Sequence, residues 1–214
     1  MPRWYSSPGR AVRSLVRLAR NLAMDLRYGG FAGGWVQQRY SGATGVANTD
    51  YRLLDQIFPG EITDGDVLVD VGCGKGRVLN WWLHHHPRNE IFGLEIMEDI
   101  AARTGRRLRS FPNVHVISGD AIANLPENGT VFFLANPFEA PLLARFKERV
   151  AAIFGGRAGR KILYFAPIHL WVFAEDASWD VRVRSLSDPG AGRFEERHRN
   201  VAVIRQNSAP VSSP

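Results

Sequence analysis

Short apolar runs alternate with amphipathic segments along most of this chain. Five such runs predict strands, at residues 67–71, 91–95, 114–117, 131–135 and 161–165. The longer segments between them repeat apolar residues at helical spacing, most clearly at 76–86, 96–109 and 140–154. Strands joined through helices of this length predict right-handed crossovers and a parallel sheet covered on both faces. With two closing strands expected at 179–186 and 200–205, the pattern predicts an α/β protein with a doubly wound, mostly parallel sheet.

The N-terminal segment, residues 8–27, predicts a basic amphipathic helix. One face gathers the apolar residues Val12, Leu15, Val16, Ala19, Leu22, Ala23 and Leu26, and another carries Arg10, Arg13, Arg17 and Arg20. Residues 1–40 hold seven arginines against the single acid Asp25, and this excess accounts for the whole net charge of +6. Such a helix is typical of attachment to an anionic surface, either lipid headgroups or an acidic substrate. The alternative is a helix packed on the domain with its arginines in solvent.

The next segment, residues 28–48, mixes glycines with large aromatic residues and has neither helical nor strand periodicity. It predicts either a lid over a site or a plain linker. Asn48 or Thr49 is then expected to cap a helix that reaches about Phe58. We therefore divide the chain into an N-terminal helix and lid or linker (1–47), a domain (48–207) and a disordered tail (208–214).

Composition narrows the compartment that we expect. The 214 residues include one cysteine, which excludes an internal disulfide framework and fits a reducing cytoplasm. No apolar run approaches the roughly 18 residues of a membrane span, and arginines interrupt any signal-peptide core. We expect a cytoplasmic protein that is neither exported nor inserted, with a possible peripheral location at the membrane through the N-terminal helix.

The turn after the first predicted strand carries the strongest chemical signal. Val67 to Val71 is apolar except for Asp70, and glycines follow at positions 72, 74 and 76. Glycines there let the backbone turn sharply and approach a ligand closely. The dinucleotide fingerprint requires a further glycine where this chain has Arg77, which argues against an NAD-dependent oxidoreductase. A tight turn without a ligand is the simpler alternative.

The acid and the Gly-x-Gly-x-Gly turn resemble the first motif of class I S-adenosylmethionine-dependent methyltransferases. The resemblance implies a Rossmann-like, seven-stranded sheet with an antiparallel C-terminal strand, and S-adenosyl-L-methionine as the cofactor. It assigns Asp70 and the loop residues Gly72, Cys73, Gly74 and Gly76 to the methionine half of that cofactor. Because Cys73 lies inside the turn, we interpret it as a small packing residue rather than a nucleophile.

Acids also close the next two predicted strands, and ligands of doubly wound sheets bind beyond such strand ends. Glu95 stands where a carboxylate can accept hydrogen bonds from both ribose hydroxyls, and the resemblance assigns it that role, with Ile96 beside it. Asp120 resembles the acid that meets the adenine amino group, and Ala121 would contact the ring. Each acid has the alternative role of a loop cap.

The fourth predicted strand ends in Asn136-Pro137-Phe138, where the methyl acceptor is expected. Pro137 stiffens the turn, the Asn136 amide is expected to accept hydrogen bonds from an amine or hydroxyl, and Phe138 would offer an apolar face. Enzymes that methylate planar nitrogens carry two prolines here, whereas this chain has one. A hydroxyl acceptor needs a general base, for which His169 is the first candidate and Glu139 the second. Three consecutive histidines, at 84–86, point in different directions on a helix and are rejected as a metal site.

A weaker resemblance links residues 40–165 to non-SET lysine methyltransferases and related bacterial proteins. It is carried by Asn48-Thr49-Asp50-Tyr51, by Gly93-Leu94-Glu95 and by Asn136-Pro137-Phe138, and it implies that Thr49 contacts the cofactor. We expect a methyltransferase of unknown acceptor, a small molecule or a protein amine, with N-methylation slightly ahead of O-methylation. The alternative is a noncatalytic cofactor-binding or membrane-associated scaffold on the same fold. Nucleic acid is an unlikely partner, because the charge balances outside residues 1–40.

Overall fold

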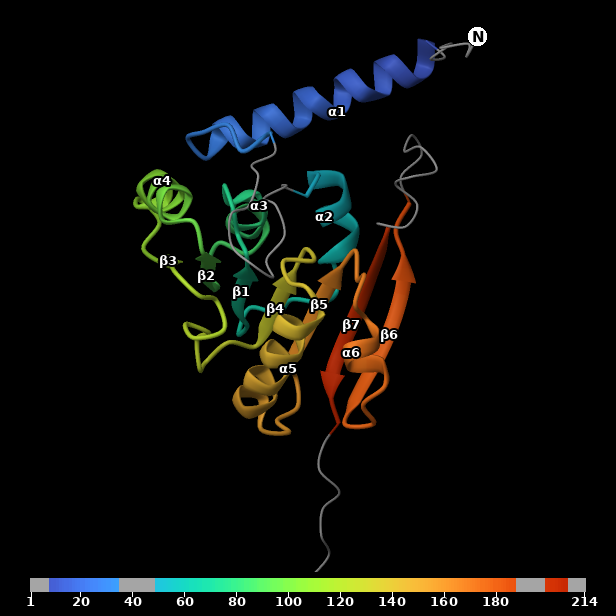
Figure 1. Ribbon diagram of the computed structural model, residues 1–214. Coiled ribbons are helices and arrows are strands. Elements are labelled where there is room, and N and C mark those ends of the chain that lie inside the picture. Colours follow the sequence, from blue (N-terminus) through green and yellow to red (C-terminus); the bar gives the residue numbers. More distant parts are fainter. Residues whose placement is uncertain (1–7, 35–48, 188–198, 208–214) are drawn as a thin grey trace, which may run out of the picture.

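A seven-stranded sheet forms the centre of the protein (Figure 1). The computed structural model describes residues 8–34, 49–187 and 199–207. The strands run in the order β3-β2-β1-β4-β5-β7-β6, and β7 is antiparallel to both of its neighbours whereas the other pairs are parallel. Their bounds are β1 Val67–Val71, β2 Glu90–Glu95, β3 Val114–Ser118, β4 Val131–Leu134, β5 Lys161–Phe165, β6 Trp179–Ser185 and β7 Asn200–Gln206. The predicted α/β class and the antiparallel C-terminal strand are confirmed.

The direction of strand progression reverses between β1 and β4. The chain proceeds outward from β1 through β2 to β3 and then returns to place β4 on the other side of β1. Asp70 in β1 lies opposite Gly93 of β2 and Phe133 of β4. Ligands of doubly wound sheets bind at such a reversal, beyond the carboxyl ends of the strands. The carboxyl ends of β1, β2 and β4 therefore form the edge where a site is expected.

Helices cover both faces of the sheet because the strands alternate their apolar side chains between the faces. In β1, Leu68 faces one buried cluster together with α2 and α3, whereas Val69 faces a second cluster with α5 and α6. The helices are α1 Pro8–Arg27, α2 Tyr51–Ile57, α3 Arg77–His85, α4 Glu98–Leu108, α5 Ala140–Phe154 and α6 Trp171–Ala174. No helix in these described ranges is long and apolar enough to cross a membrane.

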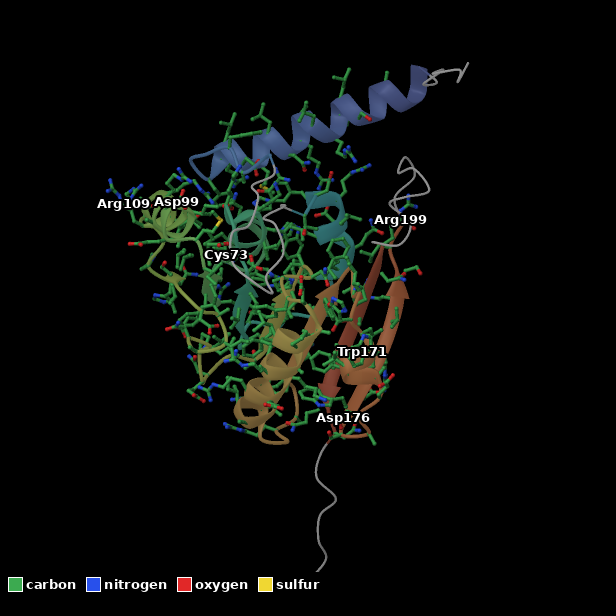
Figure 2. All side chains as sticks on the ribbon, in the orientation of Figure 1. Cys73, Asp99, Arg109, Trp171, Asp176 and Arg199 are labelled. Atoms are coloured by element: carbon green, nitrogen blue, oxygen red, sulfur yellow. The ribbon has the colours of Figure 1, made fainter. Side chains whose placement is uncertain are left out.

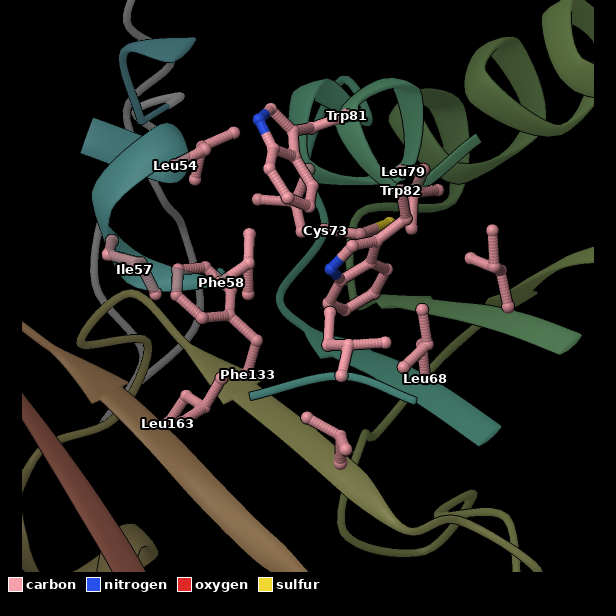
Figure 3. Packing of buried hydrophobic residues seen from close by; sticks show 14 of the residues in the cluster. Leu54, Ile57, Phe58, Leu68, Cys73, Leu79, Trp81, Trp82, Phe133 and Leu163 are labelled. Carbon is pink, nitrogen blue, oxygen red and sulfur yellow. The ribbon is translucent and has the colours of Figure 1, made fainter. Parts of the chain in front are cut away.

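Aromatic rings fill the first cluster, which Figure 3 shows from close by. The ring of Phe58 lies 4.9 Å from Trp81, 5.4 Å from Trp82 and 5.2 Å from Phe133, between centroids. Offset and edge-to-face contacts of this kind add to the stabilisation from burial alone. They fix α3, which begins directly after the glycine turn, against the sheet.

Helix α2 begins one residue later than the pattern predicts. Its N-cap is Asp50, whose carboxylate accepts a hydrogen bond from the backbone N–H of Arg52 at 2.9 Å. The sequence analysis placed this cap at Thr49 or at Asn48, which lies outside the described residues. A carboxylate caps as well as a threonine hydroxyl, and here it also accepts a hydrogen bond from Asn21 of α1. This second contact is long-range and leaves no local signal.

Helix α1 lies across the top of the molecule in Figure 1, over α4, α3 and α2. Its polar side contacts the domain: Arg17 pairs with Asp50 at 3.6 Å, and Arg20 with Asp55 at 2.6 Å. Its apolar side faces solvent, with Leu15 66% and Val16 63% exposed. The helix thus packs on the domain, as in the alternative, but through its polar side, where Arg17 and Arg20 pair with acids of the domain.

Candidate functional site

The turn between β1 and α3 is built by its glycines. Gly72, Gly74 and Gly76 all adopt positive φ, at 83°, 52° and 78°, a region that side chains with a Cβ enter only with strain. The backbone N–H groups of Gly72 and Cys73 both donate to the Leu94 carbonyl. A Cβ at Gly72 would lie 3.1 Å from Cβ of Pro137. The glycine turn therefore touches the turn after β4, and two of the predicted motifs meet.

Glu95 ties the end of β2 to this turn. One carboxylate oxygen accepts from Gly74 N–H and the other from Met97 N–H, each at 2.8 Å. Its side chain is buried, and burial raises its pKa, although these backbone hydrogen bonds oppose the rise. A carboxylate oxygen accepts more than one hydrogen bond, so Glu95 retains acceptor capacity for hydroxyl donors. Ile96, the residue between Glu95 and Met97, is half-buried.

Asp70 is a buried acid at the same edge, and the described residues give it no hydrogen-bond donor. Burial first, and the Glu95 carboxylate second, raise the pKa of Asp70 well above its usual range. Two neighbouring buried acids are costly to ionise together and favour a ligand that brings positive charge or hydrogen-bond donors. The site thus fits a cationic ligand with hydroxyl groups.

Cys73 lies in the interior between α3 and the sheet (Figures 2 and 3). Burial raises the pKa of its thiol well above the usual range, and the Asp70 and Glu95 carboxylates raise it further. The thiol therefore stays protonated. This agrees with its interpretation as a packing residue, because the thiolate is the nucleophilic form.

Asp120 follows β3 and is exposed. Its carboxylate accepts from the backbone N–H of Ile122 at 2.9 Å, which makes it the cap of the following turn. The adjacent Gly119 N–H donates to the Glu95 carbonyl at 3.0 Å, so this loop starts beside the end of β2. Ala121 is half-buried and Ile122 is buried. The loop-cap role is thus present, and the exposed position leaves the carboxylate accessible to a ligand.

Asn136 lies two residues after the end of β4, beyond Ala135, and adopts φ of 53°. Its side-chain carbonyl accepts a hydrogen bond from the Tyr164 hydroxyl at 2.7 Å. This oxygen, which is expected to accept a hydrogen bond from an acceptor substrate, accepts one from Tyr164 in the structure, and an amide oxygen has two lone pairs. Ala166, directly after the neighbouring strand β5, also adopts positive φ, at 50°. Leu134 of β4 pairs with Tyr164 of β5, so both strained residues stand two positions beyond this pair. Such clustering is a feature of functional sites.

The other residues predicted at the acceptor side do not lie together. Pro137 contacts the glycine turn, whereas Phe138 is buried in the second cluster with its ring 5.7 Å from Phe146. Phe138 is therefore a core residue and offers no open apolar face. His169 is half-buried, and its backbone N–H lies 3.5 Å from the Tyr164 hydroxyl. The described residues include no hydrogen bond to its imidazole.

Sequence reasoning missed a buried polar network beneath α1. Arg77 donates two hydrogen bonds to Asp25, at 2.8 and 3.2 Å, and Asp25 also accepts from the Tyr51 hydroxyl at 2.8 Å. Asn80 donates to Tyr51, and Arg107 donates to both Asn80 and the Lys75 carbonyl. Two signals were present: Asp25 is the single acid of residues 1–40, and Arg77 stands where a dinucleotide fold has glycine.

The described part of the predicted lid, residues 28–34, lies on the glycine turn. Lys75 Nζ donates to the Gly33 carbonyl at 2.5 Å, and Arg107 donates to the Tyr28 carbonyl at 2.7 Å. Residues 35–48 of that prediction fall outside the described ranges. Thr49 is buried just before the α2 cap. Residues 28–34 thus contact the candidate site through Lys75 and Arg107.

The histidines at the end of α3 adopt separate contacts. The ring of His85 stacks on Trp81 at 3.9 Å, and His84 meets His85 edge-on at 84°. Across the described ranges, no three His, Cys, Asp or Glu side chains gather in a way that could hold a metal ion.

Comparison with known proteins places this geometry in a fold. No protein-family model and no curated protein sequence matches the chain. Among solved structures, the S-adenosylhomocysteine-bound Podospora anserina methyltransferase PaMTH1 matches with a TM-score of 0.54 and 18% identity, over 75% of this chain and 80% of its own. The B. subtilis m1A22 tRNA methyltransferase TrmK matches with a TM-score of 0.54 and 15% identity, over 75% of this chain and 67% of its own.

The mitomycin 7-O-methyltransferase MmcR also matches, with a TM-score of 0.53 and 17% identity over 72% of this chain. The match spans 52% of the length of that enzyme, so about half of it has no counterpart here. At such identities the likeness establishes fold and nothing finer. The chain has the Rossmann-like methyltransferase fold.

Proposed function

We propose that this chain is an S-adenosylmethionine-dependent methyltransferase. One observation carries the proposal: the positive-φ glycine turn is bonded to Glu95 beside the buried Asp70, at the strand reversal of this fold. The cofactor has an ammonium and a sulfonium for the acids, and ribose hydroxyls for Glu95. Two structures of this fold are described as bound to S-adenosylhomocysteine and S-adenosylmethionine, which supports the same choice of ligand.

The predicted cofactor-binding residues take the following roles in this proposal. Asp70 and the turn at Gly72–Gly76 hold the methionine half, and Glu95 accepts from the ribose. Asp120 and Ala121 contact the adenine ring across the loop that starts at Gly119. Thr49, just before the cap of α2, remains a further predicted contact to the cofactor. When bound, the cofactor supplies an activated methyl group, so the protein has to align the acceptor and exclude water.

The acceptor side favours N-methylation slightly over O-methylation. Asn136, fixed by Tyr164, presents a neutral amide at the expected position, and an amine acceptor needs only to be neutral. A hydroxyl acceptor would require a base, for which His169 is the first candidate and Glu139, just before α5, the second. Neighbours in fold include both O-methyltransferases and a tRNA methyltransferase, which supports testing both kinds of acceptor.

Calorimetric titration with S-adenosylhomocysteine tests the cofactor site. Gly74→Arg should abolish binding because its side chain would fill the turn, while Gly159→Arg should bind as the unmodified protein does. The control suits the test because Gly159 also has positive φ, at 85°, and nothing lies near its Cβ position. It lies between α5 and β5, at the opposite edge of the sheet. Equal affinities of the two variants would refute the site.

Transfer of a labelled methyl group separates the enzyme from a noncatalytic binding protein. The acceptor panel should hold lysine peptides, small amines, phenols, sugars and tRNA. Tight cofactor binding with no labelled product on any acceptor would favour the noncatalytic alternative. A thermal shift with NAD but none with S-adenosylmethionine would favour the oxidoreductase instead.

A further inference from the structure

Helix α1 presents an unusual face to solvent. Its exposed large apolar side chains form one continuous stripe along the helix: Val12, Leu15, Val16, Leu18, Leu22 and Leu26. Phe31, four residues beyond the helix, is another large apolar side chain in solvent, 60% exposed. Isolated exposed apolar residues are ordinary, whereas a contiguous apolar surface marks an interaction site.

The orientation of α1 is fixed by polar contacts on its other side. Asp25 is bonded to Arg77 and Tyr51 in the interior, and Asn21 donates to Asp50. Rotating the helix to bury Leu15 and Val16 would break these contacts and leave Arg77 buried without its partner. The apolar stripe therefore stays outward while the domain is folded.

Positive charge borders the stripe. Arg20 is half-exposed although it pairs with Asp55, and Arg27 is exposed. All of the net charge of +6 belongs to residues 1–40, which contain seven arginines and one acid. The single acid, Asp25, is buried, so it does not oppose an approaching anion at the surface.

We propose that α1 docks the protein on an anionic lipid bilayer, with its apolar stripe among the acyl chains and the exposed Arg20 and Arg27 at the phosphates. A 20-residue helix lying in the interface is about 30 Å long, and this combination of an apolar face with basic borders is typical of interfacial helices. A second copy of the chain is disfavoured as the occupant, because it would bring two sets of seven arginines together.

Docking would turn the candidate site toward the membrane. The arrowheads of β1 and β4 point to the side on which α1 lies (Figure 1). Residues 28–34, which continue from α1, contact the glycine turn through Lys75 and Arg107. Docking does not depend on methyl transfer, and its test measures vesicle binding rather than enzymatic activity.

Co-sedimentation of the full chain with vesicles tests the docking. We expect binding to vesicles that contain phosphatidylglycerol, and at least about tenfold weaker binding to pure phosphatidylcholine. Leu15→Glu should weaken binding by about tenfold or more, since it removes a large apolar side chain from the stripe. Ser14→Glu is the matched control: it adds the same charge one position earlier, at an exposed residue outside the stripe, and should weaken binding much less.

Circular dichroism should show both variants folded, because both positions are exposed. No binding of the unmodified chain to either vesicle would overturn the proposal. So would equal effects of the two substitutions, or a concentration-dependent dimer, measured by sedimentation, that Leu15→Glu dissociates and vesicles do not compete with. Binding that is equal on both vesicle types would refute the role of the arginines.

Discussion

Arg77 and Asp25 form a buried ion pair, with Nη2 and Nε of the guanidinium donating to the two carboxylate oxygens at 2.8 and 3.2 Å. The arginine opens α3 directly after the glycine turn, and the aspartate lies in the last turns of α1. The pair also lies against an aromatic ring, since the guanidinium is 5.3 Å from the centroid of Tyr51. Arg77, which argues against a dinucleotide cofactor in the sequence, thus joins the N-terminal helix to the glycine turn.

Asp25→Ala should be strongly destabilising, because it leaves the Arg77 charge buried without its partner. We expect a loss of about 3–5 kcal/mol in the free energy of unfolding, measured by urea titration. Asp99→Ala is the control, since Asp99 pairs with Arg103 on the outer side of α4 (Figure 2) and both are well exposed. It should cost less than about 1 kcal/mol. Similar losses in the two variants would contradict a buried role for Asp25.

Asp70→Asn should change stability with pH in a defined direction. The pKa of Asp70 is raised in the folded protein, so the folded state holds this proton to a higher pH than the unfolded chain does. Its contribution to stability is therefore fully present below the ordinary carboxyl range and is lost as the pH rises through the raised pKa. The asparagine variant should gain stability relative to the unmodified protein as the pH rises from 4 to 8. Thermal unfolding across that range measures it, with Asp99→Asn as the matched substitution at an exposed site.

Binding of the positively charged cofactor should lower the raised pKa of Asp70 again. A sulfonium and an ammonium near Asp70 and Glu95 favour the ionised carboxylates, so binding should release protons at pH values below their raised pKa in the free protein. Affinity should consequently fall as the pH falls. Calorimetry in two buffers of different ionisation enthalpy counts the protons, and proton uptake would contradict this account. Asp70→Asn should weaken binding by roughly tenfold or more, given the strength of charge-assisted contacts.

The sequence predicted the elements and the edge of the sheet where they converge, because both depend on local patterns. Gly72 and Asn136 were found after β1 and β4, the two strands between which the strand order reverses, and Glu95 at the end of β2 bonds to the same glycine turn. Contacts between distant segments could not be predicted. The hydrogen bond between Tyr164 and Asn136 and the burial of Phe138 depend on how β5 and α5 pack, and neither leaves a periodic signal. The amphipathic pattern of α1 was predicted, but which face the domain would cover depended on Asp25.

Tyr164→Phe tests whether the fixed orientation of Asn136 matters for turnover. Burial raises the pKa of Tyr164 to about 12, so its hydroxyl remains a donor throughout the neutral range. Removing it should cost about 1 kcal/mol in stability and lower the methyl-transfer rate about tenfold, with cofactor affinity nearly unchanged. Tyr28→Phe removes a tyrosine hydroxyl to which the described residues make no hydrogen bond, and it should leave the rate alone. An equal loss of rate in both variants would remove Asn136 from the acceptor side.

Gly93 in β2 lies directly beneath the glycine turn. A Cβ there would come within 2.8 Å of Leu79 Cδ1 and 2.9 Å of Cys73 Sγ, which is closer than packed atoms approach. Gly93→Ala should therefore displace the turn. We expect a loss of about 1–3 kcal/mol in the free energy of unfolding and a weaker affinity for the cofactor.

Gly105→Ala offers a control of opposite sign. It lies within α4, and its Cβ would make an ordinary 3.6 Å contact with Val116. Alanine should stabilise the helix there by roughly 0.5–1 kcal/mol and leave cofactor affinity unchanged.

Shortening Leu79 to alanine in the Gly93→Ala background should restore part of the affinity, because the Leu79 contact disappears. The restoration should stay incomplete, since Cβ of Cys73 would still lie 3.2 Å away. Full affinity in Gly93→Ala alone would mean that the turn moves without affecting the ligand, and the glycine turn would then not be the binding element.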